Sequence, residues 1–418
     1  MLITFTVMNV KLAIIGGGAA GFFAAINAAE MSPGIEVHVF EKAAQFLSKV
    51  RVSGGGRCNV THACFNPKEL IQFYPRGSRE LLGPFYVFNP ADTIEWFEKR
   101  RVKIQAEADG RMFPVTNTSQ TIIDCFLQEA EHYNVQLHTQ IGLTGITQLD
   151  NQQWQLNFNH GGDFIADAVI FASGSSAPIW EILQQLGHTI INPLPSLFTF
   201  HIKDKRIDEL MGVSVPDVIC KIDGEKISST GPLLITHWGL SGPAILKLSA
   251  WAAVQLAAKQ YQFTLKINFL PEYNYQSCLE LLISQKSTSP KKHIQLYPIG
   301  AVPSRLWKSI CLFCGINDKI NWSDASKDML QKLADSLTQA AFKVTGKSTF
   351  KEEFVTCGGV ALEEVDLRTM QSKKLPGIYF AGEVLNIDAV TGGFNFQAAW
   401  TTAYIAASSI TNPVESKK

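Results

Sequence analysis

The pattern of apolar and polar residues predicts the same α/β structure near both ends of the chain. Residues 11–15 and 35–40 have the short apolar and alternating patterns of strands, and the alanine-rich run 22–30 between them has the length of a helix. Near the C-terminus, residues 378–381 predict a buried strand and residues 395–405 predict a helix. Strands that alternate with helices in this way are typical of a doubly wound parallel sheet.

The first half of the chain adds elements that fit such a sheet. Residues 89–103 predict a capped amphipathic helix that begins at Asn89, and residues 119–133 carry apolar side chains at helical spacing. Residues 154–158 and 164–166 predict a β-hairpin. Residues 168–173 form an apolar strand that ends on small residues, which is how a buried parallel strand reaches a ligand at the carboxyl edge of its sheet.

The pattern changes near Pro193. Several short strand-like runs follow between residues 195 and 270, interrupted by one helix over 243–259, and helical patterns dominate from residue 273. This change predicts an insert within the sheet domain. The expected domains are residues 1–190 and 347–418 for the two parts of the sheet domain, 191–271 for a β-rich, barrel-like insert, and 272–346 for a helical subdomain.

The balance of charge narrows the class of partner. Lys and Arg total 37, as do Asp and Glu, so the formal net charge is zero, which argues against nucleic acid as the main partner. No apolar run reaches the ~18 residues that span a bilayer, so no membrane segment is expected. The apolar N-terminus has neither a positively charged region nor a cleavage site, which predicts a cytoplasmic protein.

The eight cysteines lie at irregular spacings, which is typical of reduced thiols. Only Cys311 and Cys314 form a C-x-x-C pair, and they lie in an apolar stretch with a helical pattern. No second pair or nearby histidine completes a zinc site, so we expect two buried structural thiols and no metal.

A glycine motif follows the first strand directly. Gly16, Gly18 and Gly21 have the order G-x-G-x-x-G, in which the first glycine allows a tight turn, the second leaves room for a pyrophosphate and the third lets the helix pack on the strand. The first amides of the helix then face the phosphates. Glu41 ends the second strand, twenty residues past Gly21, where an acidic residue binds a ribose diol.

Two further stretches predict contacts with the same ligand. Residues 53–59, SGGGRCN, form a glycine-rich loop with a cation that can meet phosphate, and Lys49 lies just before it. Near the C-terminus, an acidic residue follows the strand 378–381, and the pair Gly392 and Gly393 begins the last helix. A strand, an acid and a glycine pair at a helix start indicate a second ligand-facing edge of the sheet.

Four stretches together resemble a known family: residues 16–21 (GGGAAG), 53–59, 236–246 (THWGLSGPAIL) and 377–400 (GIYFAGEVLNIDAVTGGFNFQAAW). They are similar to the bacterial flavoproteins called NAD(P)/FAD-dependent oxidoreductases or the aminoacetone oxidase family, which includes a protein linked to bile-acid dehydroxylation. The resemblance implies a glutathione-reductase-type FAD domain interrupted by a barrel-like and helical insert. Residues 172–178, ASGSSAP, depart from the double glycine of many members, so the contacts of that loop stay open.

The resemblance also implies which residues hold FAD. The first glycine loop would lie under the pyrophosphate, Glu41 would bind the adenosine ribose, Glu383 would contact the ribityl chain, and the start of the last helix would lie by the pyrimidine end of the flavin. The full set of expected cofactor contacts is Gly16, Gly18, Ala19, Ala20, Gly21, Glu41, Lys42, Lys49, Gly55, Gly56, Arg57, Gly382, Glu383, Asp388, Gly393, Phe394 and Asn395.

The candidates for catalysis are Cys58, Asn59 and His237, with Arg111 as a possible anion clamp. Packing, turn capping and surface ion pairing are the alternatives for these residues. The expected function is an FAD-dependent oxidoreductase that acts on a small organic molecule, such as an activated alkene or ketone. The alternative is a flavoprotein with a macromolecular partner, such as an RNA-modifying enzyme or a redox-linked regulator.

No second G-x-G-x-x-G unit is visible, so NAD(P)H is expected to dock transiently at the flavin or to be replaced by another electron donor. The sequence does not determine the substrate or the oligomeric state.

Overall fold

The computed structural model describes residues 10–348 and 355–412. The N-terminal stretch on which the expectation of a cytoplasmic protein rests lies almost entirely outside these ranges. The chain divides into two compact units, Met1–Pro193 with Val355–Lys418 and Leu194–Phe354. Each unit is described by itself below.

A seven-stranded sheet forms the centre of the first unit, in the order β19-β20-β21-β10-β1-β2-β6. β21, β10, β1, β2 and β6 run parallel, whereas β19 and β20 are antiparallel at one edge. Ile15 pairs with Phe40 on one side and Phe171 on the other, so these strands end level with one another. The bounds are β1 Lys11–Ile15, β2 Glu36–Phe40, β6 Gln136–His138, β10 Ala168–Phe171, β19 Val365–Asp366, β20 Gln371–Ser372 and β21 Ile378–Phe380.

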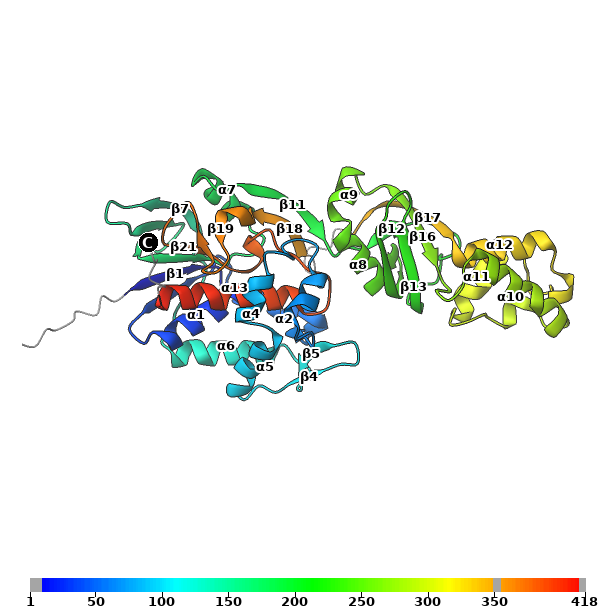
Figure 1. Cartoon of the computed structure of the whole chain (residues 1–418), viewed down its shortest axis with the longest axis horizontal. Coiled ribbons are helices and arrows are strands. Elements are labelled where there is room, and N and C mark those ends of the chain that lie inside the picture. Colours follow the sequence, from blue (N-terminus) through cyan, green and yellow to red (C-terminus); the bar gives the residue numbers. More distant parts are fainter. Residues whose placement is uncertain (1–9, 349–354, 413–418) are drawn as a thin grey trace, which may run out of the picture. The chain divides into compact units, whose positions relative to one another are not determined.

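Helices cover one face of this sheet, and α13 lies alongside α1 (Figure 1). The alanines of α1 allow this close packing, and aromatic rings fill the space around them: Phe23 and Phe126 lie 5.2 and 5.6 Å from Trp400 between ring centroids. An asparagine capping box begins α5, as its sequence predicts. The bounds are α1 Ala19–Met31, α5 Pro90–Lys99, α6 Gln120–His132 and α13 Phe394–Thr411.

A small antiparallel sheet covers the other face. β8 and β9 pair as the predicted hairpin, and β7 pairs with β8. Phe40 of β2 stacks on Phe158 of β8 with 4.4 Å between ring centroids. Strand alternation therefore sends Val37 and Val39 toward the helices and Phe40 toward this sheet. The bounds are β7 Leu143–Gln148, β8 Trp154–Phe158 and β9 Asp163–Ala166.

Shorter elements complete the first unit. β3 and β4 flank β5 in a three-stranded antiparallel sheet, and β11 pairs with β18. The bounds are α2 Ser48–Gly56, β3 Thr61–His62, α3 Pro67–Leu70, η1 Ile71–Phe73, α4 Leu82–Val87, β4 Ile104–Ala106, β5 Arg111–Pro114, α7 Ala177–Gln185, β11 Ile190–Ser196, β18 Val355–Val360, η4 Leu362–Glu364 and η5 Gly382–Val384.

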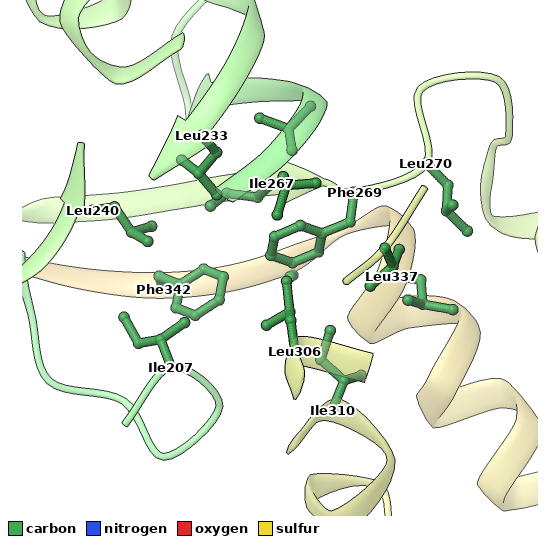
Figure 2. Packing of buried hydrophobic residues seen from close by; sticks show 14 of the residues in the cluster. Ile207, Leu233, Leu240, Ile267, Phe269, Leu270, Leu306, Ile310, Leu337 and Phe342 are labelled. Carbon is green, nitrogen blue, oxygen red and sulfur yellow. The ribbon is translucent and has the colours of Figure 1, made fainter. Parts of the chain in front are cut away.

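The second unit is a closed six-stranded barrel, in the order β12-β15-β14-β13-β16-β17, with helices packed against it. One apolar cluster runs from the barrel into the helices, and Figure 2 shows Phe269 and Phe342 beside Leu306 and Leu337. The bounds are β12 Phe200–Ile202, β13 Ser214–Ile222, β14 Ser228–Thr236, β15 Gly239–Ser241, α8 Pro243–Trp251, α9 Ala253–Ala258, β16 Phe263–Asn268, α10 Tyr275–Thr288, η2 Ile294–Leu296, α11 Ser304–Phe313, η3 Trp322–Asp324, α12 Lys327–Thr338 and β17 Ala340–Lys347.

The expected helical subdomain 272–346 is wrong at its C-terminal end. Residues 340–347 form β17, which closes the barrel between β16 and β12. Its pattern has the period of a strand, since Ala340, Phe342 and Val344 are buried and alternate with exposed residues. The helix expected over 243–259 also breaks, at Ala252.

The C-x-x-C pair has the character that its sequence predicts. Cys311 and Cys314 are buried free thiols, and burial raises the pKa of both. Within residues 10–348 and 355–412, no group of three or more histidine, cysteine or acidic side chains is placed to hold a metal ion. No helix in these ranges has the length and the apolar character needed to cross a bilayer.

Candidate cofactor site

The carboxyl ends of four parallel strands bring the predicted ligand-facing residues to one edge of the sheet. Gly16 follows β1, Glu41 follows β2, Gly174 follows β10, and Glu383 follows β21. These strands are neighbours in the sheet, so residues more than 350 positions apart in the sequence share one edge. This is the edge at which open α/β sheets bind their ligands.

The three motif glycines differ in how closely their surroundings pack, as the sequence predicts. A Cβ on Gly16 would lie 2.5 Å from the carbonyl oxygen of Ala172, and a Cβ on Gly21 would lie 1.9 Å from the carbonyl oxygen of Gly16. A Cβ on Gly18 would meet nothing within 4 Å. Two glycines therefore permit close packing, and the third leaves the N-terminus of α1 open to a ligand.

The side chain of Glu41 folds over the glycine loop. Its Oε2 accepts a hydrogen bond from the Gly17 amide and its Oε1 accepts one from the Ala43 amide, both at 2.8 Å. Carboxylate oxygens can each accept a second hydrogen bond, so Glu41 is fixed in place and still able to meet ribose hydroxyls. The exposed Lys42 reaches the hydroxyl of Ser176 at 3.4 Å.

Lys49 and Glu383 form an ion pair at this edge, although 334 positions separate them. The Nζ–Oε2 distance is 2.6 Å, and Glu383 Oε1 accepts a hydrogen bond from the Thr356 amide at 2.9 Å. Gly174, after β10, would place a Cβ 3.6 Å from Glu383. The two residues that sequence reasoning assigned to separate motifs therefore lie together.

The stretch 53–59 leaves the regular helix of α2, as its glycine-rich composition predicts. Ser53 has a non-helical ψ angle, Gly54, Gly55 and Gly56 all have positive φ angles, and the residues after Gly56 lie outside α2. The last two glycines are exposed, and a Cβ on either would meet nothing within 4 Å. Their backbone is therefore open to a ligand that approaches α2.

Arg57 and Arg111 both have carboxylate partners. Arg57 contacts Glu107 at 2.6 Å and lies 4.0 Å from the centre of the Phe113 ring, while Arg111 contacts Glu107 at 2.8 Å and Asp109 at 2.7 Å. An anion that bound either guanidinium would compete with Glu107. Their roles as phosphate contact and anion clamp stay predictions.

Two glycines precede α13, and the side chain of Asn395 in its first turn is hydrogen-bonded to the backbone of Ala389. Gly393 is the N-cap with φ +92°, and a Cβ there would lie 2.4 Å from the carbonyl oxygen of Thr61. The Asn395 side chain accepts a hydrogen bond from the Ala389 amide and donates one to its carbonyl oxygen. Phe394 is 2 % exposed, so its ring packs inward, and only its backbone is available to a cofactor.

A network of buried polar side chains, centred on Gln397, holds the first turns of α13 in place. Gln397 Oε1 accepts hydrogen bonds from the hydroxyls of Thr61 at 2.6 Å and Thr93 at 2.9 Å, and its Nε2 donates to Thr401 at 3.1 Å. Each of these four residues is 0 % exposed. Buried amides and hydroxyls that satisfy one another in this way fix the helix in one position.

Two predicted site residues are wrong as direct contacts, because their side chains have no accessible surface. Asp388 is 0 % exposed and forms an ion pair with Arg76. Cys58 is also 0 % exposed, and burial raises its pKa to about 12, so it is a packed thiol at neutral pH.

The two remaining catalytic candidates lie in different units. Asn59 packs against Gly393 and accepts a hydrogen bond from the Met112 amide at 3.3 Å, so it borders the start of α13. His237 lies in the Leu194–Phe354 unit, where its ring packs edge-on against Trp238 with 4.0 Å between centroids. The catalytic role of each stays a prediction.

Sequence reasoning missed Ser173, which follows β10. Its Oγ is buried and has no hydrogen-bond partner among the described residues, and its Cα would lie 2.7 Å from a Cβ on Gly16. Unpartnered buried hydroxyls are rare in folded proteins and call for an explanation. Together with the open backbone at Gly18, Gly55 and Gly56, this hydroxyl fits an edge that holds a polar cofactor; the only signal in the sequence was the small-residue end of an apolar strand.

Comparisons with known proteins agree with this geometry. The family model described as HI0933-like protein Rossmann domain matches residues 10–409. The chain is 28% identical over 410 residues to the ribosomal RNA dihydrouridine synthase of Haemophilus influenzae, covering 95% of this chain and 97% of the relative, and 28% identical over 405 residues to the Escherichia coli protein of the same name, covering 94% and 96%. It is 24% identical over 406 residues to the 3-dehydro-bile acid delta(4,6)-reductase of Clostridium scindens, covering 95% and 98%.

Solved structures with this fold include a flavocytochrome c3 fumarate reductase, with a TM-score of 0.50, 13% identity, and coverage of 96% of this chain and 78% of that one. The 3-ketosteroid delta1-dehydrogenase of Sterolibacterium denitrificans has a TM-score of 0.50, 10% identity, and coverage of 96% and 99%. Likeness at this level of identity shows the fold alone, and the cofactor follows from the family.

Proposed function

The chain belongs to the HI0933-like Rossmann family of FAD-binding oxidoreductases, and on that premise we propose that it reduces an activated carbon–carbon double bond. Its substrate class is then an unsaturated carbonyl compound. The observation that carries the cofactor part of the proposal is the shared sheet edge, where the loops of Gly18, Glu41 and Glu383 follow neighbouring parallel strands. The names of the dihydrouridine synthases and the delta(4,6)-reductase support the reduction, because each describes a product with a saturated carbon–carbon bond.

The residues of the edge would hold FAD by distinct means. The amides at the start of α1 would bind the pyrophosphate, assisted by the helix dipole, and Glu41 would bind the ribose. The positive end of the α13 dipole would stabilise negative charge at the flavin end. FAD supplies hydride transfer when it is bound, and the chain supplies orientation and electrostatics.

NADH or NADPH is the proposed electron donor. The sequence contains no second G-x-G-x-x-G unit to form a dedicated nicotinamide domain, so the donor would dock transiently at the flavin. The test is anaerobic addition of NADH or NADPH to the yellow protein. Loss of the oxidised flavin absorbance is expected, while bleaching by dithionite alone would exclude these donors.

The substrate class is tested with the reduced protein. Recovery of the oxidised absorbance on addition of a conjugated dienone steroid, with formation of the saturated product, is the expected result. A protein that fails to turn over any of a panel of conjugated enones would contradict the proposal for small molecules.

A uridine in ribosomal RNA is the second candidate substrate. The observation that favours it is the pair of 28% identical relatives, both named ribosomal RNA dihydrouridine synthase and both matched over nearly their whole length. Mass spectrometry of ribosomal RNA from cells without the gene tests it. Loss of a dihydrouridine that the restored gene returns is the expected result, and an unchanged set of modified nucleosides would exclude it.

A further inference from the structure

A segment outside every predicted motif runs against the loop that leads into α13. The Val390 amide donates a hydrogen bond to the Phe73 carbonyl oxygen at 3.0 Å, and Arg76 forms an antiparallel β-bridge with Asp388. A Cβ on Gly77 would lie 2.7 Å from the side chain of Ile387. Residues 73–77, called the strap below, therefore follow the loop 386–393 closely.

The strap neutralises the charge that this loop buries. Arg76 contacts both carboxylate oxygens of Asp388 through its Nε and Nη2 atoms. The Asp388 side chain is 0% exposed and the Arg76 side chain 16%. A two-point contact of this kind fixes the orientation as well as the charge.

The strap also holds the first residue of α13. The Tyr74 hydroxyl donates a hydrogen bond to the Phe394 carbonyl oxygen at 2.6 Å, and the Phe73 ring stacks on the Phe394 ring at 4.2 Å. Burial raises the pKa of Tyr74 well above its usual value, so the hydroxyl keeps its proton. The Asn395 side chain makes two hydrogen bonds with the backbone of Ala389, the neighbour of Asp388, so the loop is joined to the helix start.

We infer that Tyr74 and Arg76 are positioning residues for the flavin end of FAD. The inference rests on the proposed placement of the flavin at the start of α13. Tyr74 would fix the direction of the first helix amides, and Arg76 would cancel a buried negative charge that would otherwise repel electrons added to the cofactor.

Four variants and one control test the inference. The variants are Arg76→Met, Arg76→Lys, Tyr74→Phe and the double variant Arg76→Met/Asp388→Asn. The control is Arg368→Met, because Arg368 makes the same two-point contact with Asp366 in the same unit, but its side chain is 89% exposed. Each protein is stripped of FAD and titrated with it, and the midpoint potential of the reloaded protein is measured.

Arg76→Met and Tyr74→Phe are expected to weaken FAD binding at least tenfold, and Arg76→Met to lower the midpoint potential as well. Arg76→Lys is expected to retain the midpoint potential, because it keeps the positive charge although it loses the two-point contact with Asp388. The double variant is expected to recover the potential, since it removes both charges, and Arg368→Met is expected to match the parent protein in both measurements.

Folded Arg76→Met and Tyr74→Phe proteins with the parent affinity and potential would overturn the inference. If Arg76→Met does not fold, Tyr74→Phe decides the matter on affinity, because Arg76→Lys and the double variant are both expected to keep the parent potential. These readouts need no substrate, so a parent protein that reduces no enone would overturn the proposed function and leave this inference testable.

Discussion

The two helix starts at the sheet edge look alike in sequence but are held differently. Both α1 and α13 begin after glycines, and in the proposed site both would direct backbone amides toward FAD. The start of α1 is held by close backbone packing, of Gly16 against Ala172 and of Gly21 against Gly16, whereas the start of α13 is held by the buried side chains of Thr61, Tyr74 and Thr93. The first helix start therefore depends on glycines that allow close approach, and the second depends on polar side chains more than 300 positions away in the sequence.

The largest effect is expected from changing the packed glycine of the first helix start. Gly21→Ala places a Cβ 1.9 Å from the Gly16 carbonyl oxygen, so the backbone must move, at a cost of about 3 kcal/mol or more in the free energy of unfolding. Urea denaturation measures it.

Gly18→Ala is the matched control in the same motif. A Cβ there meets nothing, and the φ angle of −91° suits alanine, so the free energy of unfolding should hardly change while FAD binding weakens. Equal destabilisation by the two variants would contradict the view that Gly21 is needed for packing and Gly18 for access to the ligand.

The start of α13 should be destabilised when the buried polar network around Gln397 is removed. Gln397→Leu removes the acceptor of the Thr61 hydroxyl and leaves the Thr93 hydroxyl only its longer contact with the Asn89 carbonyl oxygen at 3.3 Å, at an expected cost of about 2–3 kcal/mol in the free energy of unfolding. Gln276→Leu is the control, because the exposed Gln276 side chain donates its hydrogen bond to Glu280 on the surface of α10. A loss of less than about 0.5 kcal/mol for Gln397→Leu would show that the network does not hold α13.

Acid sensitivity is expected away from both helix starts, at His188 and Glu364. Burial lowers the pKa of His188, and although burial alone would raise the pKa of Glu364, hydrogen bonds from Lys374 and Thr189 lower it to about 2. In both cases the unfolded chain binds more protons, so stability is lost as the pH falls, first below about 6.5 for His188 and then from about 4.5 toward 2 for Glu364.

Glu364→Gln should flatten the lower part of this pH dependence, by roughly 1–2 kcal/mol between pH 5 and 3. Thermal melting of the parent and variant proteins across this range measures it. Parallel pH profiles for the two proteins would rule out a contribution from Glu364.

The smallest effect on stability is expected at the ion pair between Lys49 and Glu383. Lys49 is 58% exposed, so Lys49→Met should change the free energy of unfolding by less than about 1 kcal/mol while weakening FAD binding. Titration of the apoprotein with FAD at two salt concentrations measures how much of the affinity for FAD is electrostatic. An unchanged affinity would remove Lys49 from the proposed site.

Prediction from sequence succeeded where the pattern itself dictates the structure. The bounds of β1 match the predicted strand, the asparagine cap begins α5, and the G-x-G-x-x-G glycines meet the packing that the motif requires. It failed at β17, whose alternating pattern follows a long helical stretch. Cys58 and Asp388 were expected at the site because they lie within the motifs that carry the family resemblance, but burial removes both from contact with a ligand.

The sequence by itself determined that a strand, a glycine turn and a helix follow one another, because contiguous residues form these three elements. The family and its FAD cofactor follow from motifs of the same local kind. Only the tertiary structure decided that Lys49 meets Glu383, that Arg76 neutralises Asp388 and that Tyr74 holds Phe394. The physical reason is that these contacts form when strands distant in sequence become neighbours in one sheet, and hydrophobic patterning fixes the strands but not the partners of the polar residues beside them.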